Sequence, residues 1–130
     1  MTFDELKSQN AYIIESLEAM PEIYATAERE LAAARTSINE AKDMLSDAEL
    51  EAELSAVIDG KNAEERKLQK QEAIASSPTV QAAKKNLYTC EARILEKEAE
   101  VKEYSIKFRA VIAFAELQTA RMNFFSKINN

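Results

Sequence analysis

Hydrophobic residues recur every seven positions along most of the chain, in two long stretches. In the first stretch, the positions seven apart hold Leu17, Tyr24, Leu31, Ile38, Leu45 and Ala52. Three residues after the first five of these come Met20, Ala27, Ala34, Ala41 and Ala48. Apolar residues in this spacing form one face of an α-helix and are typical of helices packed as a coiled coil.

The second stretch repeats the arrangement in the second half of the chain. The positions seven apart hold Val80, Leu87, Ile94, Val101, Phe108, Ala115 and Met122. Their partners three residues further on are Ala83, Cys90, Lys97, Tyr104, Val111, Gln118 and Phe125. Lys97 and Gln118 are polar exceptions. Repeats of this length predict two long packed helices, but they say little about function, because such a row is first of all a core.

Capping residues predict where the first helix begins. Thr2 followed three residues later by Glu5 matches a capping box, in which each side chain bonds to the backbone N–H of the other residue. The apolar pattern then continues, so we expect a long helix over about 3–58. Pro21 lies inside this pattern and is expected to kink the helix or to mark a restart.

A turn over 59–62 is predicted to follow, because Gly60 is the only glycine of the chain. Glycine adopts the left-handed backbone that often ends a helix, so we expect a positive φ there. Asn62 is the expected N-cap of a short helix over about 63–75. Catalysis is not needed to explain the turn, since a phosphate-binding loop requires several glycines.

A last long helix is expected over about 78–127, because a proline suits the first position of a helix. The two long helices can then pack side by side in opposite directions. Folding the chain back midway between them predicts Leu45 beside Ile94 and Leu31 beside Phe108.

The composition agrees with this reading. The chain has 130 residues, of which 46% are hydrophobic, but only one glycine and two prolines. A β-sandwich needs a turn residue about every ten positions, so a sheet fold is excluded. We predict a single domain over residues 1–130 with an all-α fold. It is a long antiparallel helical hairpin, a coiled coil with a short third helix at its tip, and it assembles into a helical bundle.

Few residues favour catalytic chemistry. The sequence has no histidine, and Cys90 is its only cysteine, so a thiol nucleophile would lack its usual base. Metal sites in four-helix bundles use Glu-x-x-His pairs, which the sequence does not contain. We therefore expect no catalytic residues, no metal and no cofactor, in a protein that is not an enzyme.

The sequence also bears on location. Asp4 and Glu5 make the N-terminus unlike a signal peptide. No stretch approaches the roughly 18 uninterrupted apolar residues of a membrane span. A lone cysteine fits a reducing compartment, so a cytoplasmic protein is expected.

The end of the hairpin opposite the tip is predicted to hold an oligomer together. Its apolar face is too wide for one partner helix to cover, which argues for a homodimer or a higher oligomer. The residues expected at this interface are Tyr12, Ile13, Ile14, Ile112, Phe114, Phe124 and Phe125. The alternative is a helix lying on a membrane surface, which a net charge of −6 disfavours.

Charge is distributed unevenly. Residues 1–60 contain 14 acidic and 4 basic side chains, whereas residues 61–130 contain 9 acidic and 13 basic ones. Much of this charge should pair between the two long helices. The basic residues near the tip are Lys61, Arg66, Lys67, Lys70, Lys84 and Lys85. They form either a solvated surface or a contact for nucleic acid or an acidic protein partner.

The segments "GKNAEERKLQ" and "SSPTVQAAKKNL", between an Ala/Glu-rich helix and a second heptad helix, resemble a group of small helical proteins from bacteriophage and prophage genomes. The resemblance covers about residues 30–115. It implies no catalytic motif and suggests a role alongside phage DNA replication or recombination. Our hypothesis is a non-enzymatic, oligomeric coiled-coil protein that binds other proteins, as a phage accessory or adaptor. The alternative is a DNA-binding accessory factor that uses the basic tip.

Overall fold

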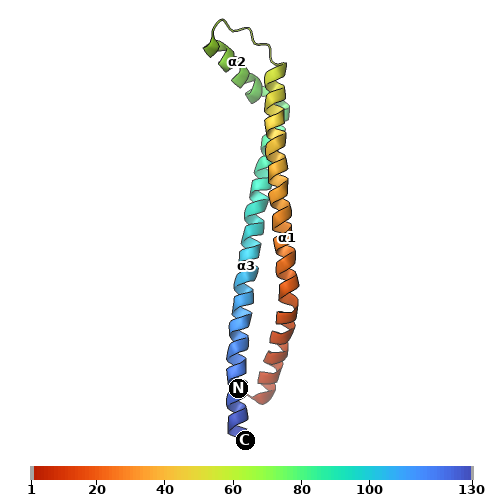
Figure 1. Cartoon of the computed structure of the whole chain (residues 1–130), viewed down its shortest axis with the longest axis vertical. Coiled ribbons are helices and arrows are strands. Elements are labelled where there is room, and N and C mark those ends of the chain that lie inside the picture. The colour runs from red at the N-terminus through yellow and green to blue at the C-terminus, as the bar shows by residue number, and fades with distance from the viewer. Residues whose placement is uncertain (1, 130) are drawn as a thin grey trace. The chain divides into compact units, whose positions relative to one another are not determined.

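The computed structural model describes residues 2–129 and contains three helices (Figure 1). They are α1 (Phe3–Ser55), α2 (Ala63–Ser76) and α3 (Pro78–Asn129). The long helices pack against each other in opposite directions, and no strand occurs among residues 2–129. The all-α hairpin with a short third helix is thus confirmed. The predicted helix ends are close to those observed, except that α1 ends at Ser55, before the predicted 58.

The predicted N-terminal caps are present. The N–H of Thr2 donates to Glu5 Oε2 at 2.9 Å, and the N–H of Glu5 donates to Thr2 Oγ1 at 3.1 Å. Asn62 caps α2 by accepting the Glu65 N–H at 2.8 Å. These bonds satisfy N–H groups that the first turn of a helix leaves without a partner.

Pro21 neither ends nor restarts α1, which is one continuous helix through this position. A proline inside a helix removes one backbone hydrogen bond and crowds the preceding turn. The surrounding turns nevertheless stay helical. The expected restart is therefore not seen.

Gly60 lies in the loop between α1 and α2, and its φ is not positive. The predicted left-handed cap is wrong, because α1 has already ended five residues earlier. The loop is instead tied to α2 by Gln69, whose Oε1 accepts the N–H groups of Asp59 and Gly60 at 3.1 and 2.9 Å. A Cβ atom on Gly60 would lie 2.8 Å from the backbone nitrogen of Arg66. Glycine is needed here for this close approach to the start of α2.

Replacing Gly60 with alanine should therefore lower the free energy of unfolding by about 1–3 kcal/mol, since an inserted methyl group forces a well-packed region apart. Gly60→Asn should be no better tolerated than Gly60→Ala, because asparagine is favoured only where φ is positive. Urea unfolding of both variants checks this. An asparagine variant as stable as the wild type would show that the left-handed backbone forms after all.

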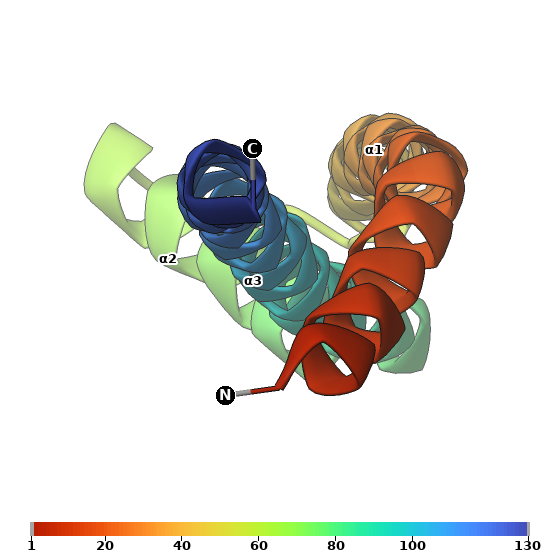
Figure 2. The ribbon, with the colours of Figure 1, turned by 90° about the horizontal axis from the view of Figure 1, so that it is seen from below.

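Internal contacts divide the chain into two compact units. The first unit comprises the described residues up to Leu31 and from Lys97 onward, where the start of α1 lies beside the end of α3 (Figure 2). The second unit comprises residues 32–96, which include all of α2. Most of the buried residues lie in the predicted seven-residue rows: Ala27, Leu31 and Gln118 in the first unit, and Ala34, Ala41, Ala48, Val80 and Ala83 in the second. Leu6 and Ile13 are also buried, although neither belongs to a predicted row.

The alignment of the two helices differs from the prediction. Leu45 packs against the cluster of Ala48, Val80 and Ala83. The contacts of Gln9 with Gln118 and of Glu30 with Lys97 likewise differ from the predicted alignment, which set Leu31 beside Phe108. Phe108 borders a hollow together with Met20 and not with Leu31. The observed alignment of α1 and α3 differs from the predicted one at α2. The last turns of α1 extend past the start of α3 and pack against α2. Ile74 of α2 joins the same apolar cluster, and Lys70 forms a 3.3 Å ion pair with Glu53 of α1.

Candidate interaction surfaces

A second row of apolar side chains runs along the C-terminal part of α3, within the first unit. We call it the α3 stripe, and it consists of the apolar residues Ala110, Phe114, Leu117, Phe124 and Ile128, with the half-buried Arg121 between Leu117 and Phe124. Each member up to Phe124 directly precedes a residue of the predicted inner row, so the stripe is rotated by about 100° around the helix axis from the face that packs on α1. Leu117 is 46% exposed, and Phe124 and Ile128 are each 62% exposed. The α3 stripe is thus a second apolar face, next to the one already in use.

The stripe becomes polar toward the start of α3. The two preceding positions in the same spacing are Glu103 and Lys107, which form an exposed ion pair of 3.0 Å. The mainly apolar part therefore begins at Ala110 and continues to Ile128, with Arg121 as its one charged member. It occupies only the end of α3 that lies beside the first turns of α1.

A corresponding row lies on α1 in the same unit. We call it the α1 row, and it consists of Tyr12, Ser16, Ala19, Ile23 and Thr26. Each of these also directly precedes an inner-row residue. Because α1 and α3 are antiparallel, equal rotations about the two helix axes turn both rows to the same side of the unit. A hollow of about 400 Å³ on this side is bordered by Ala19, Ile23 and Thr26 of α1, and by Glu100 and Tyr104 of α3.

The structure places the seven residues predicted for the oligomer interface in different environments. Tyr12, Ile14, Ile112 and Phe124 are exposed. Phe114 and Phe125 are half-buried. Ile13 is only 2% exposed, because it belongs to the inner row of α1 that packs against α3. Its side chain is already covered within the chain, so including Ile13 in the exposed set was wrong.

Sequence reasoning missed Leu117 and Ile128, which are exposed members of the α3 stripe. It also missed Ile23, an exposed member of the α1 row. The signal was present, because these residues continue the alternating three- and four-residue spacing one position ahead of the inner row. It was overlooked because the inner row alone was counted.

The two polar exceptions of the inner row both have partners. Gln118 is 1% exposed, and its Nε2 donates to Gln9 Oε1 at 2.7 Å. Lys97 places its Nζ 3.0 Å from Glu30 Oε2 and 3.3 Å from Glu100 Oε2. Polar groups in a coiled-coil core favour the alignment in which they find their partners. Lys97 and Gln118 therefore help to fix how α1 and α3 are aligned in the first unit.

The hydrogen bond that Lys97 donates to Glu30 is the main cause that raises the pKa of Lys97 above its ordinary value of 10.5. Partial burial lowers the pKa of Lys97, whereas the hydrogen bond to Glu100 and the charge of Glu100 raise it further. Folding thus favours the charged amine. The charged Lys97 amine stabilises the fold fully at a pH below its pKa in the unfolded state. This stabilisation is lost as the pH rises through its higher pKa in the folded state.

A Lys97→Met variant should therefore be less stable than the wild type near neutral pH, where Glu30 and Glu100 lose their shared cation. The difference should narrow as the pH rises above about 10.5, because the wild-type amine then loses its proton. Denaturant unfolding of both proteins from neutral to strongly alkaline pH measures this difference. A difference that stays constant over the whole range would mean that the ion pairs do not stabilise the fold.

The six basic residues predicted near the tip all lie in the second unit. Lys61, Arg66, Lys67, Lys70 and Lys85 are exposed, and Lys84 is half-buried. Lys70 already pairs with Glu53, and α2 also carries acidic residues. This arrangement fits the structural role of charges that pair between helices. Nucleic-acid or acidic-partner binding by these residues stays a prediction.

The same region is less polar than the sequence suggested. Four large apolar side chains near the loop and α2 are more than half exposed, namely Leu50, Leu54, Val57 and Leu68. Only the basic residues of this region were singled out from the sequence. These apolar side chains add a second exposed apolar area, distinct from the α3 stripe.

Over residues 2–129, no group of His, Cys, Asp or Glu side chains is arranged to hold a metal ion. None of the described helices is both long enough and apolar enough to cross a membrane. No protein family matches the chain, and no curated protein or solved structure matches it. The resemblance to phage proteins stays a prediction.

Proposed function

We propose that this chain is a non-enzymatic protein that acts by binding protein, and that it does so as a homo-oligomer of helical hairpins. The observation that carries the proposal is the α3 stripe. A helix with two apolar faces about 100° apart is typical of a helix that packs against two neighbours in a bundle. Within the chain, α3 has one such neighbour in the first unit, which is α1.

The energetics support the same conclusion. Burying one large aliphatic or aromatic side chain stabilises a complex by about 1.5–3 kcal/mol relative to leaving it in water. Leu117, Phe124 and Ile128 lie on one face of α3, which only Arg121 interrupts, whereas single exposed apolar residues scattered over a surface are ordinary. A contiguous face of this kind marks a site of protein association.

The proposal is tested by the mass of the protein in solution. Size-exclusion chromatography with light scattering should show more than one chain per particle for the wild type. Leu117→Glu combined with Phe124→Glu should shift the particle to a single chain, because charged side chains would have to be buried in the interface. Circular dichroism should show that this variant remains helical.

A matched control places two glutamates on another face of the same helix. Thr119 and Asn123 are both exposed and lie outside the α3 stripe. Thr119→Glu with Asn123→Glu should leave the oligomer intact. A monomeric wild type, or dissociation by the control and not by the stripe variant, would contradict the proposed function.

A further inference from the structure

We infer that α2 undocks from the rest of the second unit by turning about Ser77, while α1 and α3 stay packed against each other. The inference goes beyond the proposed function, because it concerns a movement within a single chain. It rests on the few contacts that hold α2 in place, on the joints at its two ends, and on a cap that α3 keeps without it.

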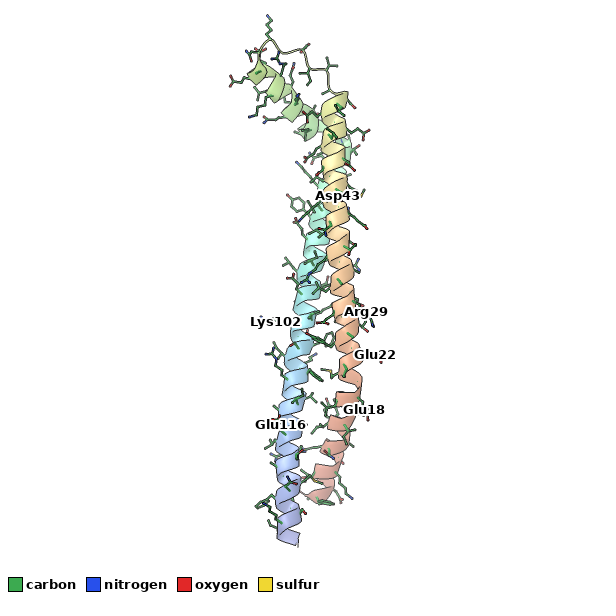
Figure 3. All side chains as sticks on the ribbon, viewed as in Figure 1. Glu18, Glu22, Arg29, Asp43, Lys102 and Glu116 are labelled. Carbon is green, nitrogen blue, oxygen red and sulfur yellow. The ribbon has the colours of Figure 1, made fainter. Side chains whose placement is uncertain are left out.

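Few side chains of α2 contribute to the core of the second unit. None of the 14 residues of α2 is buried, whereas α1 and α3 both bury residues in this unit. Gln69, Ala73 and Ile74 are half-buried, and the other residues of α2 are exposed. Side chains accordingly project from α2 away from the two long helices (Figure 3). The main apolar contact of α2 is made by Ile74, which packs against the cluster around Val80.

The polar contacts between α2 and the long helices are exposed to water. Lys70 pairs with Glu53 of α1 at 3.3 Å, but the two side chains are 47% and 37% exposed. Ion pairs exposed to water stabilise a fold only slightly. Gln81 of α3 donates from its exposed side chain to the carbonyl oxygen of Ala75 at 2.9 Å. The docked position of α2 therefore depends chiefly on Ile74.

The joint between α2 and α3 allows the movement. Ser77 is the one residue between them, and its backbone is extended, with a φ of −71° and a ψ of 120°. A residue that precedes a proline disfavours the helical conformation, so Pro78 opposes a merger of α2 and α3 into one helix. Ser77 Oγ accepts the N–H of Val80 at 3.3 Å. Because this cap comes from the joint itself, α3 keeps it when α2 moves.

The other end of α2 is joined to the loop over 56–62. Gln69 Oε1 accepts the N–H groups of Asp59 and Gly60, and Gln69 Nε2 donates to Asp59 Oδ1 at 2.6 Å. These bonds connect α2 to its own loop and not to α1 or α3. The last residues of the loop can therefore move together with α2.

Undocking changes the surface that the second unit exposes. Val80 is 0% exposed while Ile74 packs against its cluster, so the departure of α2 turns apolar surface toward water. This exposure is the free-energy cost that favours the docked form. A helix of 14 residues without packing partners is marginal in water, so the backbone hydrogen bonds of undocked α2 break readily. The second unit thus has a closed form and an open form that differ in exposed apolar surface.

Hydrogen–deuterium exchange of the full-length protein, followed by mass spectrometry, tests the inference. After correction for intrinsic rates, amides of α2 should exchange roughly tenfold or more faster than those of residues 85–95 in α3, because local opening sets the rate. Ile74→Ala should speed exchange in α2 by about threefold or more and leave residues 85–95 unchanged. Leu68→Ala is the matched control, since Leu68 is 53% exposed on the same helix. It should change exchange in α2 by less than about twofold.

Exchange of α2 as slow as that of residues 85–95 would overturn the inference. So would an equal acceleration of both segments by Ile74→Ala, because the three helices would then open together. An effect of Leu68→Ala as large as that of Ile74→Ala would show that the contact of Ile74 does not hold α2 in place, and the inference would fail as well. Fast exchange confined to α2 and sensitive to Ile74 supports it. The number of chains per particle enters none of these results, so the proposed function is judged separately.

Discussion

Replacing Ile13 with aspartate should unfold the first unit, whereas the same change at Ile14 should leave it folded. The two residues are adjacent and chemically identical, but Ile13 is 2% exposed and Ile14 is 49% exposed. Losing the buried side chain of Ile13 costs about 1.5–3 kcal/mol. The new carboxylate would be charged and unpaired among apolar groups, so the total cost should reach about 3–5 kcal/mol.

Urea unfolding followed by circular dichroism measures both variants. Both changes put the same residue into the same turn of α1, so differences in helix propensity cancel in the comparison. The measured difference then reports the environment of the two side chains. Equal destabilisation by the two changes would mean that Ile13 does not pack against α3 and that the alignment of the helices in the first unit is wrong.

The sequence predicted the periodic part of this fold well. The alternation of apolar positions identified the buried alanines of α1 and the inner row of α3, because a helix repeats its faces at fixed intervals. The same repeat counted backward from Met20 reaches Ile13 and then Leu6, both of which are buried. The repeat was counted only from Leu17 onward, and Ile13 was grouped with its exposed neighbour Ile14 for that reason.

The alignment of the two long helices could not be predicted in the same way. A repeating row fits its partner almost equally well after a shift of one repeat, so periodicity does not determine the alignment. Contacts at particular residues determine it, such as Gln118 with Gln9 and the packing of Ile74 against the end of α1. The packing of Ile74 depends on how α2 folds back, which the seven-residue repeat does not reveal.

The turn at Gly60 was predicted correctly, but the reason why a glycine is needed there was not. Gly60 is the only glycine of the sequence, which predicted a turn there, and it does lie in the loop between α1 and α2. Two different demands, a positive φ and a close approach of another backbone, both require glycine. Sequence alone does not separate them, because the second demand depends on where the start of α2 lies in space.

The location of the candidate interaction surface could be predicted from the sequence, but the exposed residues that form it could not. The sequence showed an excess of apolar residues where the start of α1 lies beside the end of α3, and the structure exposes many of them. Which residues are exposed depends on which face α3 turns toward α1. The α3 stripe emerges once Gln118 is known to be buried, because Leu117 then lies about 100° away from the buried face.

Changing Ala34 and Ala41 together to leucine should destabilise the second unit by about 2–6 kcal/mol, since overpacking costs about 1–3 kcal/mol at each site. Both alanines are nearly fully buried, at 3% and 2% exposure. Helices in contact are separated by about 8–10 Å, and small side chains on one of them permit the shorter distances. Two leucines at these positions would push α1 and α3 apart, even though they add apolar surface.

The matched control changes Ala32 and Ala33 to leucine, which are exposed positions of α1 beside Ala34. Alanine and leucine have similar helix propensities, so this control should shift the free energy of unfolding by less than about 0.5 kcal/mol. The urea midpoints of the two double variants give the comparison. If the buried pair were no more costly than the exposed pair, the alanine row would not be a close contact between α1 and α3.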